Sequence, residues 1–226
     1  MKIITIFICL IFSLSLFAQY NPEEIVKYKI KKIIKISTNT DSSETQKQEK
    51  LYDRNGNDTA TYLGGQLYTT SKYEYNSKNQ PIKRITYEHE GSERETAIYD
   101  YKPDGSFIIS NTDKQFGMTD YIYHDKKGKI TKTRIPDGSE RQYTYDPKGK
   151  LLKIKTKPGG DGVLVDLQHT YNSKGQLIKE VSMGEYKWTT THTYDAKGLL
   201  KRSVTVTSED GTQTKNYTAY EYEFWQ

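Results

Sequence analysis

The sequence predicts an all-β protein, an antiparallel meander of β-hairpin repeats that forms a curved single sheet or a partly closed barrel. The first observation is a tyrosine that recurs every 22 to 28 residues. The second is a turn residue, four positions later in six of the copies. The third is the regular spacing of many of the 20 tyrosines, which opposes disorder in a chain of low hydrophobicity. The anchor tyrosines are Tyr52, Tyr75, Tyr101, Tyr123, Tyr145, Tyr171, Tyr194 and Tyr222, and the turn residues are Gly56, Asn79, Gly105, Gly149, Gly175 and Gly198, with Gly128 five positions after its anchor.

The segment Asp146-Pro147-Lys148-Gly149 shows why each repeat turns. Asp caps the turn, Pro presets a negative φ, and Gly accepts the left-handed conformation, as does Asn at position 79. A type I turn closed by a left-handed residue predicts a hairpin with a bulge. If Asp146 pairs with Lys150, Tyr145 falls opposite Leu151 and Tyr143 opposite Lys153.

The other end of each hairpin has its own turn signals, so the predicted meander has roughly fifteen strands. These signals are Gly64-Gly65, Glu90-Gly91-Ser92, Asp113 with Gly117, Asp137-Gly138, the run 158–162, Met183-Gly184 and Asp210-Gly211.

The stretch from Gly138 to Leu151 resembles the YD repeat of the Rhs and teneurin type. The match consists of Gly138, Arg141, Tyr143, Tyr145, Asp146, Gly149 and Leu151, with weaker copies at 121–130, 171–177 and 194–200. The resemblance covers about residues 52–226 and implies a curved repeat sheet. The encapsulating shell of Rhs proteins is not implied, because the chain is short and shows neither the core-end segment nor a toxin domain.

The N-terminal region predicts an exported protein. Residues 1–18 combine Lys2, an apolar run from Ile6 to Ile11 and a small residue at Ala18, which is typical of a signal peptide. The only cysteine, Cys9, lies inside it, so thiol chemistry is excluded from the mature chain. Without these residues 33 basic and 29 acidic side chains remain, a surplus too small to indicate nucleic-acid binding. No later segment is apolar enough for a transmembrane span.

Residues 19–51 are predicted to form an N-terminal strand and a polar linker ahead of the repeat domain at 52–226. The β-branched run from Ile25 to Ser37 favours a strand, with a basic amphipathic helix as the alternative. The polar segment from Thr38 to Lys50 is expected to be a loop or linker.

An aromatic-basic stripe is the candidate binding surface. One interpretation is a glycan-binding or acidic-partner surface; the other is an aromatic ladder that holds the sheet together. His169 and His192 occupy the tyrosine row two strands apart, about 9.5 Å, too far to share a metal. The candidate residues are Tyr121, Tyr123, Lys132, Tyr143, Tyr145, Lys153, His169, Tyr171, Lys179, His192, Tyr194 and Arg202.

The C-terminal segment predicts an edge strand with large aromatic side chains: Tyr220, Tyr222, Phe224 and Trp225. Such an edge either packs back on the domain or docks onto a partner by strand addition.

The sequence contains no catalytic motif. Most of its acids fall at turns, where capping explains them, and we expect neither a cofactor nor a metal site. We therefore expect a non-catalytic structural or interaction subunit at the cell envelope with protein partners, in the periplasm or at the cell surface. The alternative is a glycan-binding module.

Overall fold

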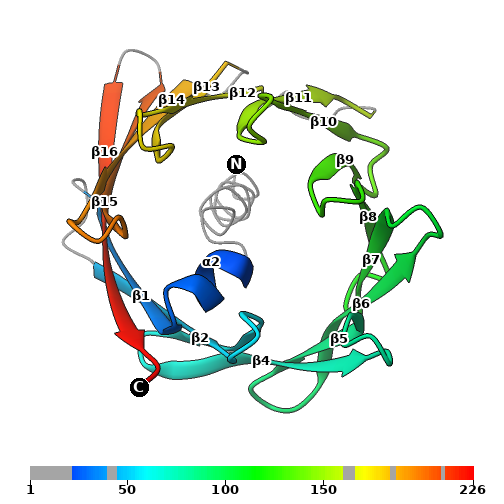
Figure 1. Ribbon diagram of the computed structural model, residues 1–226. Coiled ribbons are helices and arrows are strands. Elements are labelled where there is room, and N and C mark those ends of the chain that lie inside the picture. The colour runs from blue at the N-terminus through cyan, green and yellow to red at the C-terminus, as the bar shows by residue number, and fades with distance from the viewer. Residues whose placement is uncertain (1–21, 40–44, 160–165, 184–186, 210–211) are drawn as a thin grey trace.

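The chain forms a closed antiparallel β-barrel of sixteen strands, in which each strand pairs with its neighbours in sequence and the last returns to the first (Figure 1). The structure is a computed structural model, and it describes residues 22–39, 45–159, 166–183, 187–209 and 212–226. The predicted signal peptide and most of the predicted turn at 158–162 lie outside the described residues.

One short helix and the sixteen strands make up the described elements. They are α2 (Pro22–Lys27), β1 (Ile30–Asn39), β2 (Thr45–Tyr52), β3 (Asp58–Leu63), β4 (Gln66–Tyr75), β5 (Pro81–Glu88), β6 (Glu93–Tyr101), β7 (Phe107–Asp113), β8 (Thr119–His124), β9 (Ile130–Arg134), β10 (Glu140–Tyr145), β11 (Leu151–Lys157), β12 (Leu167–Tyr171), β13 (Leu177–Ser182), β14 (Lys187–Tyr194), β15 (Leu200–Glu209) and β16 (Thr212–Phe224).

The predicted turn chemistry is confirmed between β10 and β11. The Gly149 amide donates to the Asp146 carbonyl at 2.9 Å, and the Lys150 amide donates to the Asp146 carboxylate at 2.8 Å. Gly149 has a φ of 87°, and Asn79, its equivalent in an earlier hairpin, has a φ of 59°. Each anchor turn is therefore specified by local capping and by a residue that tolerates the left-handed region.

The predicted pairing of Tyr143 with Lys153 is wrong, whereas that of Tyr145 with Leu151 is confirmed. In β11 a bulge leaves Leu152 unpaired between Leu151 and Lys153, so Lys153 lies opposite Thr144 and Tyr143 lies opposite Ile154. Because neighbouring residues of a strand point to opposite faces, this shift of one residue sends the tyrosine and the lysine to different faces. The same bulge recurs where β12 meets β13 and where β14 meets β15.

One repeat has a different anchor. His124, rather than Tyr123, pairs with the first residue of the following strand, Ile130, and precedes the bulge. Gly128 is four residues after His124, the spacing found in the other repeats. Tyr121 and Tyr123 consequently lie on the face opposite to the other anchor tyrosines.

The strand predicted for residues 25–37 is confirmed for residues 30–37, which belong to β1, whereas residues 25–27 are helical. Residues 22–27 form α2, which lies inside the ring of strands, and the chain then enters β1 (Figure 1). Ile25 of α2 packs with Ile30, Tyr52 and Leu199 in a buried cluster, so the helix covers part of the inner wall. The expected linker is wrong for residues 45–50, which belong to β2; residues 40–44 lie outside the described part of the chain.

The predicted free edge at the C-terminus is also wrong. β16 pairs with β15 on one side and with β1 on the other, which closes the barrel. Tyr222 is part of the packing around Ile25, and the Trp225 amide donates to the Lys29 carbonyl at 2.8 Å. Tyr220 lies opposite Lys35, and Phe224, 40% exposed, lies opposite Ile30. The C-terminal segment therefore packs back on the domain.

Within the described residues, no helix is both long and apolar enough to cross a membrane.

Candidate functional site

The inner wall of the barrel gathers most of the predicted tyrosine and histidine residues. α2 marks this face, because Ile25 contacts the cluster that includes Tyr52 and Tyr222. Paired residues of neighbouring strands share a face, so the strand register identifies the inward residues of the other strands. The predicted residues that lie on the inner wall are Tyr143, Tyr145, His169, Tyr171, His192, Tyr194, Tyr220 and Tyr222.

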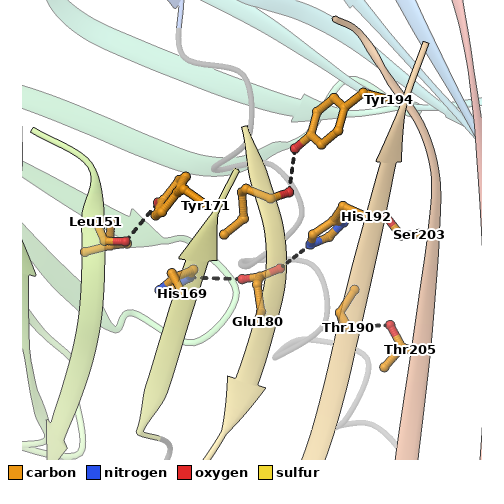
Figure 2. Close-up of polar contacts among 10 residues, drawn as sticks. Leu151, His169, Tyr171, Glu180, Thr190, His192, Tyr194, Ser203 and Thr205 are labelled. Carbon is orange, nitrogen blue, oxygen red and sulfur yellow. Dashed lines mark hydrogen bonds and ion pairs between the residues drawn. The ribbon is translucent and has the colours of Figure 1, made fainter. Parts of the chain in front are cut away.

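The anchor tyrosines brace neighbouring hairpins through their hydroxyls. Tyr145 donates to the Ile130 carbonyl at 2.8 Å and Tyr171 to the Leu151 carbonyl at 2.8 Å (Figure 2 shows the second). In each case the acceptor is the first residue of the second strand in the preceding hairpin. The equivalent donors are Tyr101, Tyr194 and Tyr222, with acceptors Pro81, Leu177 and Leu200. This repeated bond supports the interpretation of the tyrosine row as a ladder that holds the barrel together.

Lysines of the turns complete this arrangement. Lys129 lies with its Nζ 5.4 Å from the centre of the Tyr145 ring, and Lys150 lies at the same distance from Tyr171. Each lysine directly follows the turn glycine of the preceding hairpin. Burial raises the pKa of Tyr145 and of Tyr171 to about 12. The rings therefore stay neutral at neutral pH and keep their donor protons.

A buried His–Glu–His cluster spans β12, β13 and β14 (Figure 2). Glu180 accepts from His169 Nε2 and from His192 Nε2, each at 3.1 Å, and His192 Nδ1 lies 2.8 Å from Ser203 Oγ. Burial alone would raise the pKa of Glu180, but the bonds from the two histidines lower it below its ordinary value. The carboxylate is thus held ionised between the two histidines. His169 and His192 lie two strands apart, as predicted from the sequence, and Glu180 lies on the strand between them.

Ser203, His192 and Glu180 have the connectivity of a catalytic triad. A nucleophile must reach its substrate, yet Ser203 is only 2% exposed and the His192 side chain is fully buried. The arrangement satisfies buried polar groups within the wall, as Thr190 and Thr205 do next to it at 2.8 Å. The geometry supports a structural role for this cluster.

A second polar cluster lies on the inner wall from β2 to β6. Asp58 accepts from Lys50 at 3.0 Å and from the Tyr73 hydroxyl at 2.5 Å, and Arg84 pairs with Glu95. Burial acts to raise the pKa of Asp58, but Lys50 and the Tyr73 bond lower it overall. Alternating charges therefore neutralise one another across five strands.

A depression of about 190 Å³, open to solvent, adjoins this second cluster. Hydroxyl, amide and charged side chains line it: Gln48, Lys50, Thr61, Tyr68, Thr69, Thr86, Arg94 and Glu95. Such a lining offers hydrogen-bond donors and acceptors in several directions, which suits a polyhydroxylated ligand.

The predicted basic row lies on the outer face. Lys153, Lys179 and Arg202 pair with Thr144, Thr170 and Thr193, respectively. The predicted aromatic-basic stripe is therefore split between the two faces. The exception is Tyr123, which lies on the outer face with Lys132, whose Nζ is 4.6 Å from the ring centre; Tyr121 is beside them and 39% exposed.

Sequence reasoning missed Glu180 and Asp58 as partners of the predicted residues. Glu180 had a signal, because it is an acid in a strand interior while most acids fall at turns. Among the described residues, no group of three histidines, cysteines or acids is arranged to hold a metal ion.

Comparison with known proteins bears on the fold. No protein-family model matches the chain, and no curated protein matches it. A porin-like protein from Bacteroides uniformis aligns with 86% of this chain and 98% of its own at 16% identity and a TM-score of 0.55. Structures of TcdB2-TccC3 and TcdB2-TccC3-Cdc42 each align with 79% of this chain and 14% of their own, at 13% and 12% identity and TM-scores of 0.36 and 0.34. The first likeness shows a shared fold; the resemblance to YD repeats stays a prediction.

Proposed function

We propose that this chain is a non-catalytic exported scaffold, a β-barrel that is surrounded by water and associates with protein partners of the cell envelope. The observation that carries the proposal is the chemistry of the outer face. Charged side chains at outward positions occur in strands around the whole barrel: Lys32, Glu49, Glu74, Lys83, Asp100, Lys132, Arg134, Glu140, Lys153, Lys155, Lys179, Arg202, Lys215 and Glu221.

This outer face distinguishes the proposal from a pore that spans a membrane, the function suggested by the name of the porin-like structural neighbour. A barrel in a bilayer presents an apolar band to the lipid, and a lysine or arginine at its midplane costs about 2–4 kcal/mol. Fourteen charged residues distributed around the barrel would together exceed the stability of an ordinary domain, about 5–15 kcal/mol. Water on the outside is compatible with the same residues.

The proposal of a non-catalytic role rests on burial. The one Ser–His–Glu arrangement among the described residues has its serine 2% exposed. A serine-reactive fluorophosphonate probe should therefore leave Ser203 unlabelled in the folded protein. Labelling that disappears in Ser203→Ala would contradict this part of the proposal.

Glycan binding is the second candidate, and the depression beside Lys50 and Glu95 favours it. The tyrosine rings do not favour it, because their hydroxyls are bonded to backbone carbonyls and the basic row lies on the other face. Binding of envelope oligosaccharides that is lost in Thr86→Val, at a lining position, would support this candidate.

The test of the proposal has two steps. The tagged exported protein is first purified without detergent and its β-structure is measured by circular dichroism; we expect it to be folded and dispersed. It is then recovered at native expression level from gently solubilised envelope, and a partner at fixed stoichiometry is expected. A chain that stays folded only in detergent, or that is recovered alone, would overturn the proposal.

A further inference from the structure

One sector of the outer face carries many cations and few acids; at its edge, Glu140 of β10 lies opposite Lys157. We call this set the basic face: Lys153, Lys155 and Lys157 of β11, Lys179 of β13, Lys187 of β14, and Lys201 and Arg202 of β15. In β11 to β14 the only acidic residue is Glu180, and it points inward to His169 and His192.

Most of these cations are free of salt bridges. Lys153, Lys155, Lys179 and Lys201 form no ion pair with a described residue, and Lys155, Lys179 and Lys201 are exposed to solvent. Arg202 lies 4.8 Å from the centre of the Tyr217 ring, a neutral partner.

The opposite sector of the barrel is different. There Lys32 pairs with Glu49 at 3.3 Å, Lys47 with the same carboxylate at 2.6 Å, and Lys83 with Glu74 at 3.2 Å. The cations on that side are neutralised by outward acids, so the positive potential concentrates on the basic face although the net charge of the whole chain is small.

The basic face is broad and evenly charged. At the ordinary strand spacing, β11 to β15 span about 19 Å across the strands, and Lys153 to Lys157 span about 13 Å along them. Threonine and valine fill most of the outward positions between the cations on β13 to β15. No aromatic side chain points outward from a described position of these five strands.

This composition identifies the kind of partner. Protein interfaces are depleted of lysine and enriched in aromatic residues and arginine, whereas six of the seven cations here are lysines. Lysine is a hydrated point charge that suits a diffuse anionic surface better than a fork-shaped contact. Polybasic lysine surfaces of this type bind anionic lipid head groups, with roughly 1 kcal/mol for each lysine or arginine near the surface, equivalent to about fivefold in affinity.

We propose that the basic face attaches the barrel peripherally to an anionic phospholipid surface. The head-group phosphates contact the lysines of β11 and their neighbours, while the barrel remains in water. This inference depends on the water-exposed outer face of the proposed function and adds a second kind of partner, a membrane surface.

The test is co-sedimentation of the purified exported protein with vesicles of pure phosphatidylcholine or of phosphatidylcholine and phosphatidylglycerol in equal parts. We expect binding only to the anionic vesicles, weakened by salt. The variant K153Q/K155Q/K157Q should bind about 100-fold more weakly. The matched variant K47Q/K72Q/K83Q removes the same charge from the opposite sector and should bind less than about threefold more weakly.

Three results would overturn the inference: equal binding to neutral vesicles, equal losses in the two variants, or binding of an envelope protein through the basic face with no vesicle binding. Circular dichroism of both variants without detergent checks that they are folded. A wild-type protein that requires detergent would refute the proposed function, whereas a folded protein that ignores anionic vesicles refutes only the attachment.

Discussion

Truncation of Glu180 tests whether the inner polar clusters hold the barrel together. Glu180→Ala removes the shared acceptor of His169 and His192 and leaves two buried imidazoles without their partner. An orphaned buried polar group costs about 1–3 kcal/mol, so two of them, with the vacated side-chain volume, lower the free energy of unfolding by about 4 kcal/mol. Glu180→Gln keeps the shape and one acceptor oxygen, and we expect it to lower this free energy by about half as much.

The assay is urea unfolding followed by tryptophan fluorescence, which comes from Trp188, on the strand next to Glu180, and from Trp225. With a slope of about 2 kcal/mol per molar urea, a loss of 4 kcal/mol moves the midpoint down by about 2 M. The control is Glu140→Ala, whose carboxylate is bonded to Arg134 at 2.8 Å on the outer face. Partly exposed pairs contribute about 0–1 kcal/mol, so its midpoint should move by less than about 0.5 M.

The pH dependence gives the prediction a second readout. Because the pKa of Glu180 in the folded barrel lies below its ordinary value, the ionised carboxylate adds stability above the unfolded value of about 4.3 and loses it as the pH falls through the folded value. The alanine variant should therefore lose less stability than the wild type on acidification below that point. Equal midpoints for Glu180→Ala and Glu140→Ala, or identical acid profiles for variant and wild type, would refute the reasoning.

The inner tyrosines and the anchor turns allow three further predictions. Tyr171→Phe removes the bond to the Leu151 carbonyl and should lower the free energy of unfolding by about 1 kcal/mol in the same urea assay. Burial raises the pKa values of Tyr145 and Tyr171 to about 12, so the free energy of unfolding that they contribute below pH 10 should be lost as the pH rises toward 12. A variant with phenylalanine at both positions whose free energy of unfolding falls as steeply as that of the wild type over this range would contradict this. Gly149 has a φ of 87°, and the Cβ of an alanine there would lie 2.6 Å from Lys129 Nζ. Gly149→Ala should therefore lower the free energy of unfolding by about 1–2 kcal/mol in a thermal unfolding assay. Lys148→Ala in the same turn should cost less than about 0.5 kcal/mol, and equal costs would show that backbone strain is not the cause.

Turns and strands were predictable from the sequence because their chemistry is local. Asp146 and Gly149 act within one turn, and the same pattern recurs in each repeat. The face of each strand residue was not predictable from the repeat alone. A second bulge, separate from the predicted bulge at the turn, leaves Leu152 of β11 unpaired and reverses the face of Lys153, and it leaves little trace in composition.

Closure of the barrel depends on a contact between distant parts of the chain. β1 pairs with β16 from Ile33 opposite Tyr222 to Asn39 opposite Asn216. The β-branched run of β1 predicted a strand, but no local signal specifies which partner it takes. The polar sequence of β2 hid a strand for a related reason: both faces of this wall are polar, so the alternation of apolar and polar residues is weak.

The recurrent bulge also explains how one repeat can serve two purposes. If Tyr143 and Lys153 shared a face, the tyrosine row and the row of Lys153, Lys179 and Arg202 would lie together on one side of the sheet. The bulge instead places the tyrosines inside, where Tyr145 and Tyr171 bond to the backbone of the preceding hairpin, and the lysines outside. Substitutions on the inner wall should therefore change the stability of the barrel, and substitutions of the outward lysines should change what the barrel binds while its fold persists.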